Sequence, residues 1–177
     1  MAREAGLFRK YNLETSLIYI PGAAQVIQTM LAGEIHLAAA APSGVVDVVL
    51  GGGDLVTIAG MVNIPAFCLV VRPHVGIVAR RSFLVGRRET VKKFLQAYCE
   101  GVAFLTRDKE RSKTFLARYV HSNEPEVLES TWQYAIDTIE RIPYPDPEGL
   151  KVVLEERART RPEIARARPE QFIDNSI

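Results

Sequence analysis

The chain has 177 residues, of which 47% are hydrophobic and 24% are charged, a composition that excludes a disordered or a fibrous protein. This length is enough to bury a real core in one domain. The formal net charge of +1 gives no whole-protein field that would attract nucleic acid or an acidic membrane surface, so we expect no nucleic-acid partner.

The first part of the chain alternates short apolar runs with helical repeats. The expected elements are a helix over 2–11, a strand over 17–20, a helix over 23–31, a strand over 35–41, a helix over 45–50 and strands over 55–59 and 67–71. Such alternation favours parallel strands covered by helices. We therefore predict an α/β fold with a mostly parallel sheet flanked by helices.

The remainder of the chain is mainly helical. We expect a short strand over 77–79, helices over 90–105, 112–119, 126–139 and 148–159, a stiff proline-rich turn over 143–147 and a loosely ordered tail over 161–177. No segment approaches the roughly 18 apolar residues of a membrane span, and the amino terminus lacks the continuous apolar run of an export signal. As written, the chain would stay in the cytoplasm.

Two strand-to-helix turns are the candidate binding elements. Small residues at such turns leave backbone N–H groups and the positive end of a helix facing a ligand anion. The residues concerned are Pro21, Gly22 and Ala23 in one turn and Ala41, Pro42 and Ser43 in the other. The alternative is that Ser43 only caps its helix and Gly22 only permits the turn.

The sequence indicates no catalytic constellation, metal site or cofactor. Cys68 and Cys99 look like small core residues rather than a disulfide, and the three histidines, at positions 36, 74 and 121, show no metal-ligand spacing. The alternative that Ser43, Ser82 or Cys99 is a nucleophile activated by one of these histidines stays open. No G-x-S-x-G signature supports it. We therefore predict that the chain is not an enzyme.

Several short segments together resemble the SsuA/ThiY/NMT1-like solute-binding proteins. Those that match the first lobe of these proteins are 5–13 (AGLFRKYNL), 18–22 (IYIPG), 31–34 (LAGE), 41–42 (AP) and 58–60 (IAG). Those that match their carboxyl-terminal part are 79–84 (ARRSFL), 91–98 (VKKFLQAY), 100–101 (EG) and 143–145 (PYP). Order and spacing both match, so the resemblance covers nearly the whole chain.

The resemblance implies a single lobe of a type II periplasmic-binding-protein fold. In it, residues 1–71 and 77–160 form the lobe, 72–76 stand where the second lobe would be, and 161–177 are a tail. The first strand of the lobe would be missing as well. The resemblance also implies that the turns at Pro21 and Pro42 and the segment near Asn63 face the ligand cleft.

The function implied is binding of a small organic solute, such as a sulfonate or a thiamin-pyrimidine precursor, for an ABC importer with its permease. In this family such proteins work in the periplasm or cell envelope. A homodimer formed through the exposed cleft or a sheet edge is a further expected partner. The alternatives are an enzyme resembling the thiamin-pyrimidine synthases, or a structural remnant of one lobe that binds nothing.

Overall fold

The computed structural model describes residues 1–62 and 75–177. The chain forms two compact units, one made of Met1–Ser16 with Glu89–Ile142 and the other of Leu17–Arg88 with Pro143–Ile177. The expectation that 72–76 replaces a whole second lobe stays a prediction. Within the described residues, no helix is both long enough and apolar enough to cross a membrane.

The first unit is helical. Its helices are α1 (Leu7–Lys10), α5 (Arg88–Arg107, which begins in the other unit), α6 (Lys109–Val120) and α7 (Pro125–Thr138). The three long helices confirm the helical repeats read from the sequence. The expected first helix is shorter than predicted because residues 2–6 form turns that end at Gly6, whose φ of 70° is left-handed.

The amino-terminal segment of this unit packs on α5. Phe8 stacks on Phe94 with ring centroids 5.3 Å apart. A Cβ at Gly101 would lie 2.9 Å from the Cβ of Ala2, so the absence of a side chain at this position allows the segment to approach the helix.

The second unit contains a three-stranded sheet in the order β1-β3-β2, formed by β1 (Leu37–Ala40), β2 (Leu55–Val62) and β3 (Val75–Arg80). Both ladders are antiparallel, whereas the sequence predicted a mostly parallel sheet. β1 and β2 do run in the same direction, as their connection through a helix requires. β3 starts where β2 ends, so it must run back, and it lies between the other two strands.

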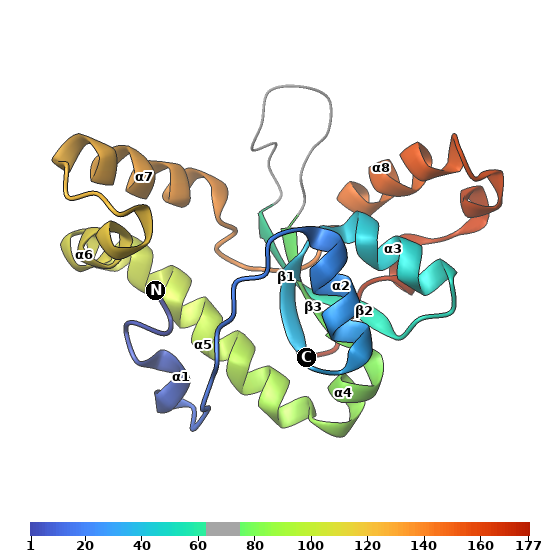
Figure 1. The fold of residues 1–177 in the computed structure, drawn as a ribbon, viewed down its shortest axis with the longest axis horizontal. Helices are drawn as coiled ribbons and strands as arrows, with labels where there is room; N and C mark the ends of the chain where they lie inside the picture. The colour runs from blue at the N-terminus through green and yellow to red at the C-terminus, as the bar shows by residue number, and fades with distance from the viewer. Residues whose placement is uncertain (63–74) are drawn as a thin grey trace. The chain divides into compact units, whose positions relative to one another are not determined.

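Helices and short 3₁₀ turns flank this sheet, which confirms the α/β class (Figure 1). The helices are α2 (Ala23–Ala32), α3 (Pro42–Leu50), α4 (Arg81–Gly86) and α8 (Pro147–Ala158), and the 3₁₀ turns are Pro162–Arg166 and Pro169–Gln171. One core cluster joins α2 and α3 to the strands, with Met30, Val45, Leu55 and Val78 fully buried. A second cluster joins α3 and α8 to the end of the chain.

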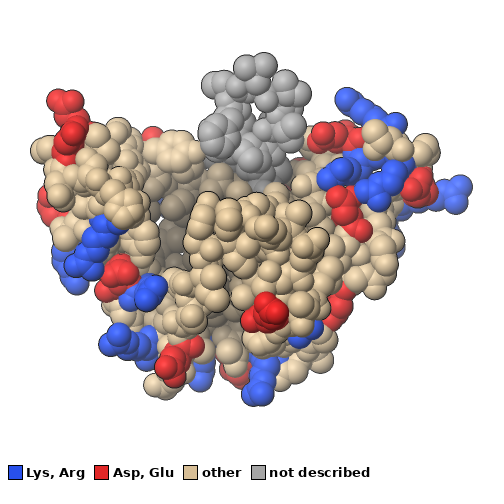
Figure 2. All heavy atoms as spheres, in the orientation of Figure 1, with Lys and Arg blue, Asp and Glu red and all other residues tan. Residues whose placement is uncertain are grey.

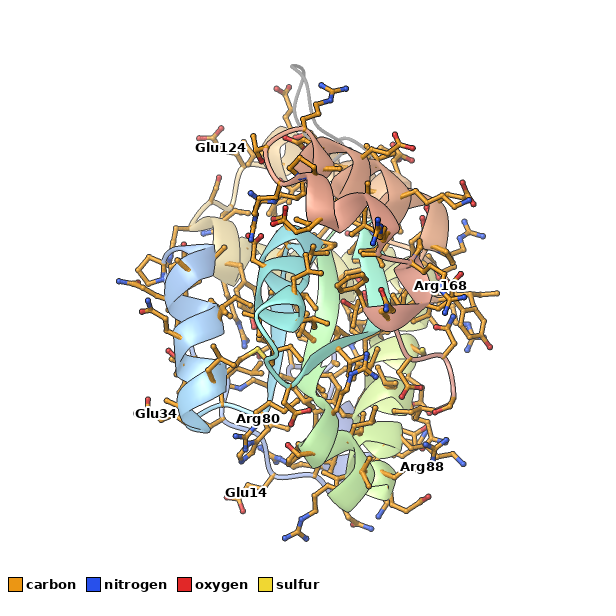
Figure 3. All side chains as sticks on the ribbon, turned by 90° about the vertical axis from the view of Figure 1, so that its right-hand side faces the viewer. Glu14, Glu34, Arg80, Arg88, Glu124 and Arg168 are labelled. Carbon is orange, nitrogen blue, oxygen red and sulfur yellow. The ribbon has the colours of Figure 1, made fainter. Side chains whose placement is uncertain are left out.

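Gly33 ends α2, as the sequence predicts. Its φ of 85° is left-handed, and a Cβ here would come within 3.3 Å of Nη1 of Arg80. Figure 3 labels Arg80 and, just past the end of α2, Glu34. Glycine is therefore favoured at this position both by the backbone conformation and by the packing of the guanidinium group.

The strand predicted over 17–20 is not formed. The segment has no regular secondary structure, and Leu17, Ile18 and Tyr19 are 51%, 66% and 89% exposed. Its apolar pattern is strand-like, yet among the described residues it has no neighbouring strand with which to pair. The strand predicted over 67–71 lies outside the described residues.

The tail predicted to be loosely ordered is in fact anchored in the core. Ile164 and Phe172 are each 1% exposed. Thr57 N donates to Phe172 O at 2.9 Å, and Asp174 N donates to Thr57 O at 2.9 Å, so the tail extends the sheet beside β2. Sequence reasoning missed this because the partner strand lies more than 100 residues earlier in the chain.

Candidate functional site

Each of the two predicted turns leads into a helix, and both helices begin at the same end of the sheet. α2 leads back into β1, and β1 leads into α3, so both helices run opposite to β1 and begin near the carboxyl end of that strand (Figure 1). β2 runs in the same direction as β1 and ends on this side too. The structure thus brings Pro21, Gly22 and Ala23 to the same end of the sheet as Ala41, Pro42 and Ser43. The remaining predicted residue, Asn63, follows β2 but lies outside the described residues.

The amino terminus of α2 has no side-chain cap among the described residues. Gly22 is the N-cap residue with a φ of 97°, and it has no side chain that could accept a hydrogen bond from the first turn of the helix. Pro21, Gly22 and Ala23 are all exposed. The first backbone N–H groups of α2 are therefore available to solvent or to an anion, and the helix dipole favours negative charge there.

The amino terminus of α3 is less open than that of α2, because Pro42 is buried and Ala41 and Ser43 are only partly exposed. Ala41 occupies the N-cap position and Ser43 is the second residue of the helix, so the alternative in which Ser43 is the cap is wrong. Pro42, in the first helical position, has no N–H, and Gly44 N donates to Ala41 O at 3.2 Å. Within the described residues no side chain caps this helix, which leaves the Ser43 N–H as a donor for a ligand.

The two helices pack against each other close to these open ends. A Cβ on Gly44 would lie 3.2 Å from Cγ1 of Ile27, so glycine at this position lets the first turn of α3 approach α2. Local sequence around Gly44 gives no signal for this contact. The role of Gly44 follows only from the packing of the two helices.

The amino terminus of α8 is different because it is already capped. Asp146 accepts hydrogen bonds from the backbone N–H groups of Glu148 at 2.9 Å and Gly149 at 3.0 Å. The preceding segment lies beside β2, since Gly60 N donates to Pro143 O at 2.8 Å. Tyr144 in this segment is 66% exposed. The α8 terminus therefore offers no free N–H groups for a ligand.

A small niche lies between α3, α8 and the strands. Its volume is about 20 Å³, which is room for one water molecule or one small chemical group. The residues that line it are Pro42, Thr57, Gly60, Val75, Gly76, Pro145, Asp146, Leu150 and Ile173. Of the predicted site residues that the structure describes, Pro42 alone contributes to it.

Thr57 is the unusual residue of this niche. It is 4% exposed, and its Oγ1 has no hydrogen-bond partner among the described residues. Leaving a buried hydroxyl without a partner lowers the stability of the folded chain, unless a water molecule or a ligand group in the niche completes its hydrogen bonding. A threonine in an apolar strand gives no sequence signal for such a role.

The candidate catalytic residues do not form a nucleophilic site in the described structure. Ser82 Oγ donates to Asp54, and neither side chain is hydrogen-bonded to a histidine within the described residues. His36 instead stacks on Phe83, with centroids 4.5 Å apart. Burial raises the pKa of the Cys99 thiol, which disfavours the reactive thiolate.

No group of three or more potential metal-ligating side chains forms outside residues 63–74. Cys68 and His74 lie in that undescribed segment. The predicted lack of a metal and of a cofactor stays a prediction.

Comparison by sequence finds no match, neither to a family model nor to a curated protein. Comparison of structures does find matches, and they show that the chain has the periplasmic-binding-protein fold. The fold predicted from the short sequence motifs is thus confirmed.

Three of the matching structures are named here. A protein of Bordetella bronchiseptica has a TM-score of 0.77 at 11% identity, covering 99% of this chain and 89% of that one. The Candida albicans CA3427 gene product, which has the generic periplasmic-binding-protein fold, has a TM-score of 0.72 at 10% identity, covering 98% and 90%. The alkanesulfonate-binding protein SsuA of Xanthomonas axonopodis pv. citri, bound to MOPS, has a TM-score of 0.71 at 10% identity, covering 98% and 92%.

Proposed function

We propose that this chain is a solute-binding component of an ABC-type importer and that it binds a small organic anion at the amino termini of α2 and α3. The observation that carries this proposal is that both termini lie at the same end of the sheet and that no side chain in the described part of the chain caps either of them. Two helix ends that present free N–H groups together suit a sulfonate or a carboxylate.

The proposed contacts come from the residues predicted to bind ligand. Pro21, Gly22 and Ala23 form the α2 side, and Ala41, Pro42 and Ser43 the α3 side, with the Ser43 hydroxyl as an additional donor. Asn63 remains a proposed contact from the segment after β2. In this role the protein would work in the periplasm or cell envelope beside a permease.

The alkanesulfonate-binding neighbour makes a sulfonate the first candidate, and a thiamin-pyrimidine precursor is the second. The thiamin-pyrimidine-synthase-like enzyme and the non-binding remnant stand as alternatives. The Candida albicans neighbour has the generic periplasmic-binding-protein fold, and the Xanthomonas neighbour is an alkanesulfonate-binding protein. Both similarities favour binding over catalysis.

The proposal is tested by titration calorimetry and thermal shift with MOPS, an alkanesulfonate, a small carboxylate and a thiamin-pyrimidine precursor, each against an uncharged analogue. We expect a bound anion to raise the melting temperature by an amount that grows with the logarithm of its concentration once this exceeds its Kd. If none of these compounds binds, the binding role is contradicted.

The site itself is tested by Ala23→Asp. The new carboxylate would occupy the open end of α2 in place of the ligand anion, so we expect affinity to fall at least about tenfold. The same change should stabilise the helix slightly, because acidic residues are favourable in the first turn. Val85→Asp on α4, where the side chain is 82% exposed, is the matched control and should leave affinity unchanged. Equal affinity of both variants would place the ligand elsewhere.

A further inference from the structure

The two outer strands of the sheet, β1 and β2, differ in whether their outer backbone groups are paired. The outer side of β2 is covered by the end of the chain, through the hydrogen bonds between Thr57 and residues 172 and 174. β1 forms the other edge and, within the described residues, pairs only with β3. Its sequence, Leu-Ala-Ala-Ala, has neither the charge nor the proline with which proteins usually protect an edge strand.

Segment 17–20 has the properties of a strand that could pair with β1. Its sequence is Leu-Ile-Tyr-Ile, which is uncharged and has high strand propensity. None of its backbone groups has a backbone partner among the described residues. The segment belongs to no helix, turn or strand, so no regular secondary structure has to be broken for it to pair.

A groove lies between this segment and the start of β1. Its volume is about 390 Å³. It is lined by Ile18, Ile20, Gln25, Gln28, Thr29, Glu34 and Ile35. Figure 2 shows that the surface over α2 carries few charged side chains, in agreement with the uncharged sequence of that helix. The surroundings of the open edge are therefore suited to an uncharged strand.

We propose that segment 17–20 of one copy pairs in antiparallel fashion with β1 of a second copy, and that the reciprocal contact forms a symmetric dimer. One chain carries both the unpaired strand-forming segment and the unpaired edge, so the surface is self-complementary. Bulky side chains from one copy meet alanines of the other, which leaves room for them.

Charge selects the antiparallel direction. A parallel pairing of residues 17–20 with 37–40 would place Glu14 of one copy opposite Glu34 of the other, three residues before each strand. These two carboxylates lie just outside the paired residues, where bringing like charges close together is unfavourable. The antiparallel pairing avoids this contact and places Ile18 opposite Ala39, Leu17 opposite Ala40 and Tyr19 opposite Ala38.

The dimer is tested by sedimentation velocity over a range of protein concentrations, without ligand. Ile18→Lys and Ala39→Lys change exposed positions on the two halves of the contact. Each single variant is expected to weaken association at least about tenfold. Val85→Lys changes an apolar position on α4 that is 82% exposed, compared with 66% for Ile18, so it is the control and should associate as the wild type does.

The register is tested by a charge pair. Ile18→Lys combined with Ala39→Glu places opposite charges across the proposed ladder, so the double variant should recover part of the association lost in Ile18→Lys. Ile18→Lys combined with Ala39→Lys should associate more weakly than either single variant. A wild-type chain that stays monomeric at its solubility limit overturns the proposal, as does a loss of association in Val85→Lys equal to that in Ile18→Lys. Either result leaves the proposed ligand site unaffected, because the dimer is measured without ligand.

Discussion

Thr57 shows how a single hydroxyl group connects stability and binding. Its Oγ1 is buried without a partner among the described residues. In Thr57→Val the shape is kept and the unpaired hydroxyl is removed, so we expect the free energy of unfolding to rise by about 1 kcal/mol. Urea denaturation measures this change, with Thr57→Ser as the control that keeps the hydroxyl. A destabilised valine variant would mean that a bound water already satisfies Thr57.

Tyr98 makes the stability of the helical unit sensitive to alkaline pH. Burial, with smaller contributions from Cys99 and Glu140, raises the pKa of its phenol from 10.0 to about 12. The folded chain therefore holds this proton more tightly than the unfolded chain. The resulting stability is present below pH 10.0 and is lost as the pH rises towards about 12.

Tyr98→Phe removes this pH dependence. The Tyr98 hydroxyl has no partner among the described residues, so the variant loses no hydrogen bond seen in the structure. We expect the alkaline decline in the free energy of unfolding to become shallower, as measured by denaturation at several pH values on either side of 10.0. Tyr11, whose hydrogen bond to Glu100 raises its pKa, should keep part of the decline. An unchanged pH profile would contradict the assignment to Tyr98.

At the scale of elements, the cap of α8 is the clearest test. Asp146 satisfies two backbone N–H groups of this helix, whose inner face supplies Leu150, Val153 and Leu154 to the core. Asp146→Ala should lower the free energy of unfolding by about 1 kcal/mol. Asp146→Asn keeps an accepting oxygen and should cost much less. Equal losses in chemical denaturation would show that the charge, not the cap, is what matters.

Across the whole molecule, the end of the chain holds distant elements together. Phe172 is 1% exposed and packs in the cluster that joins α3 and α8. Phe172→Ala should therefore lower the free energy of unfolding by about 3–5 kcal/mol, as is typical of a buried aromatic side chain. Glu170→Ala, at an exposed position in the same tail, should change it little. A small effect in both variants would support the loosely ordered tail expected from the sequence.

The sequence by itself determined the helices, the α/β class and the two turns at Pro21 and Pro42. These features depend on local periodicity, glycine and proline, which act within a few residues of the chain. The short motifs, taken in order, also predicted the periplasmic-binding-protein fold. The comparison of structures confirms it at about one residue in ten identical.

Only the tertiary structure decided the insertion of β3 between β1 and β2, the burial of Phe172 and the isolation of the unpaired Thr57 hydroxyl. It also decided that segment 17–20 remains unpaired despite its strand-like pattern. Each of these outcomes depends on which distant segment supplies a neighbour. A strand needs a partner for its backbone groups, and a buried hydroxyl needs one for its oxygen. Local sequence specifies the need for such a partner, and the folded chain determines whether it is met.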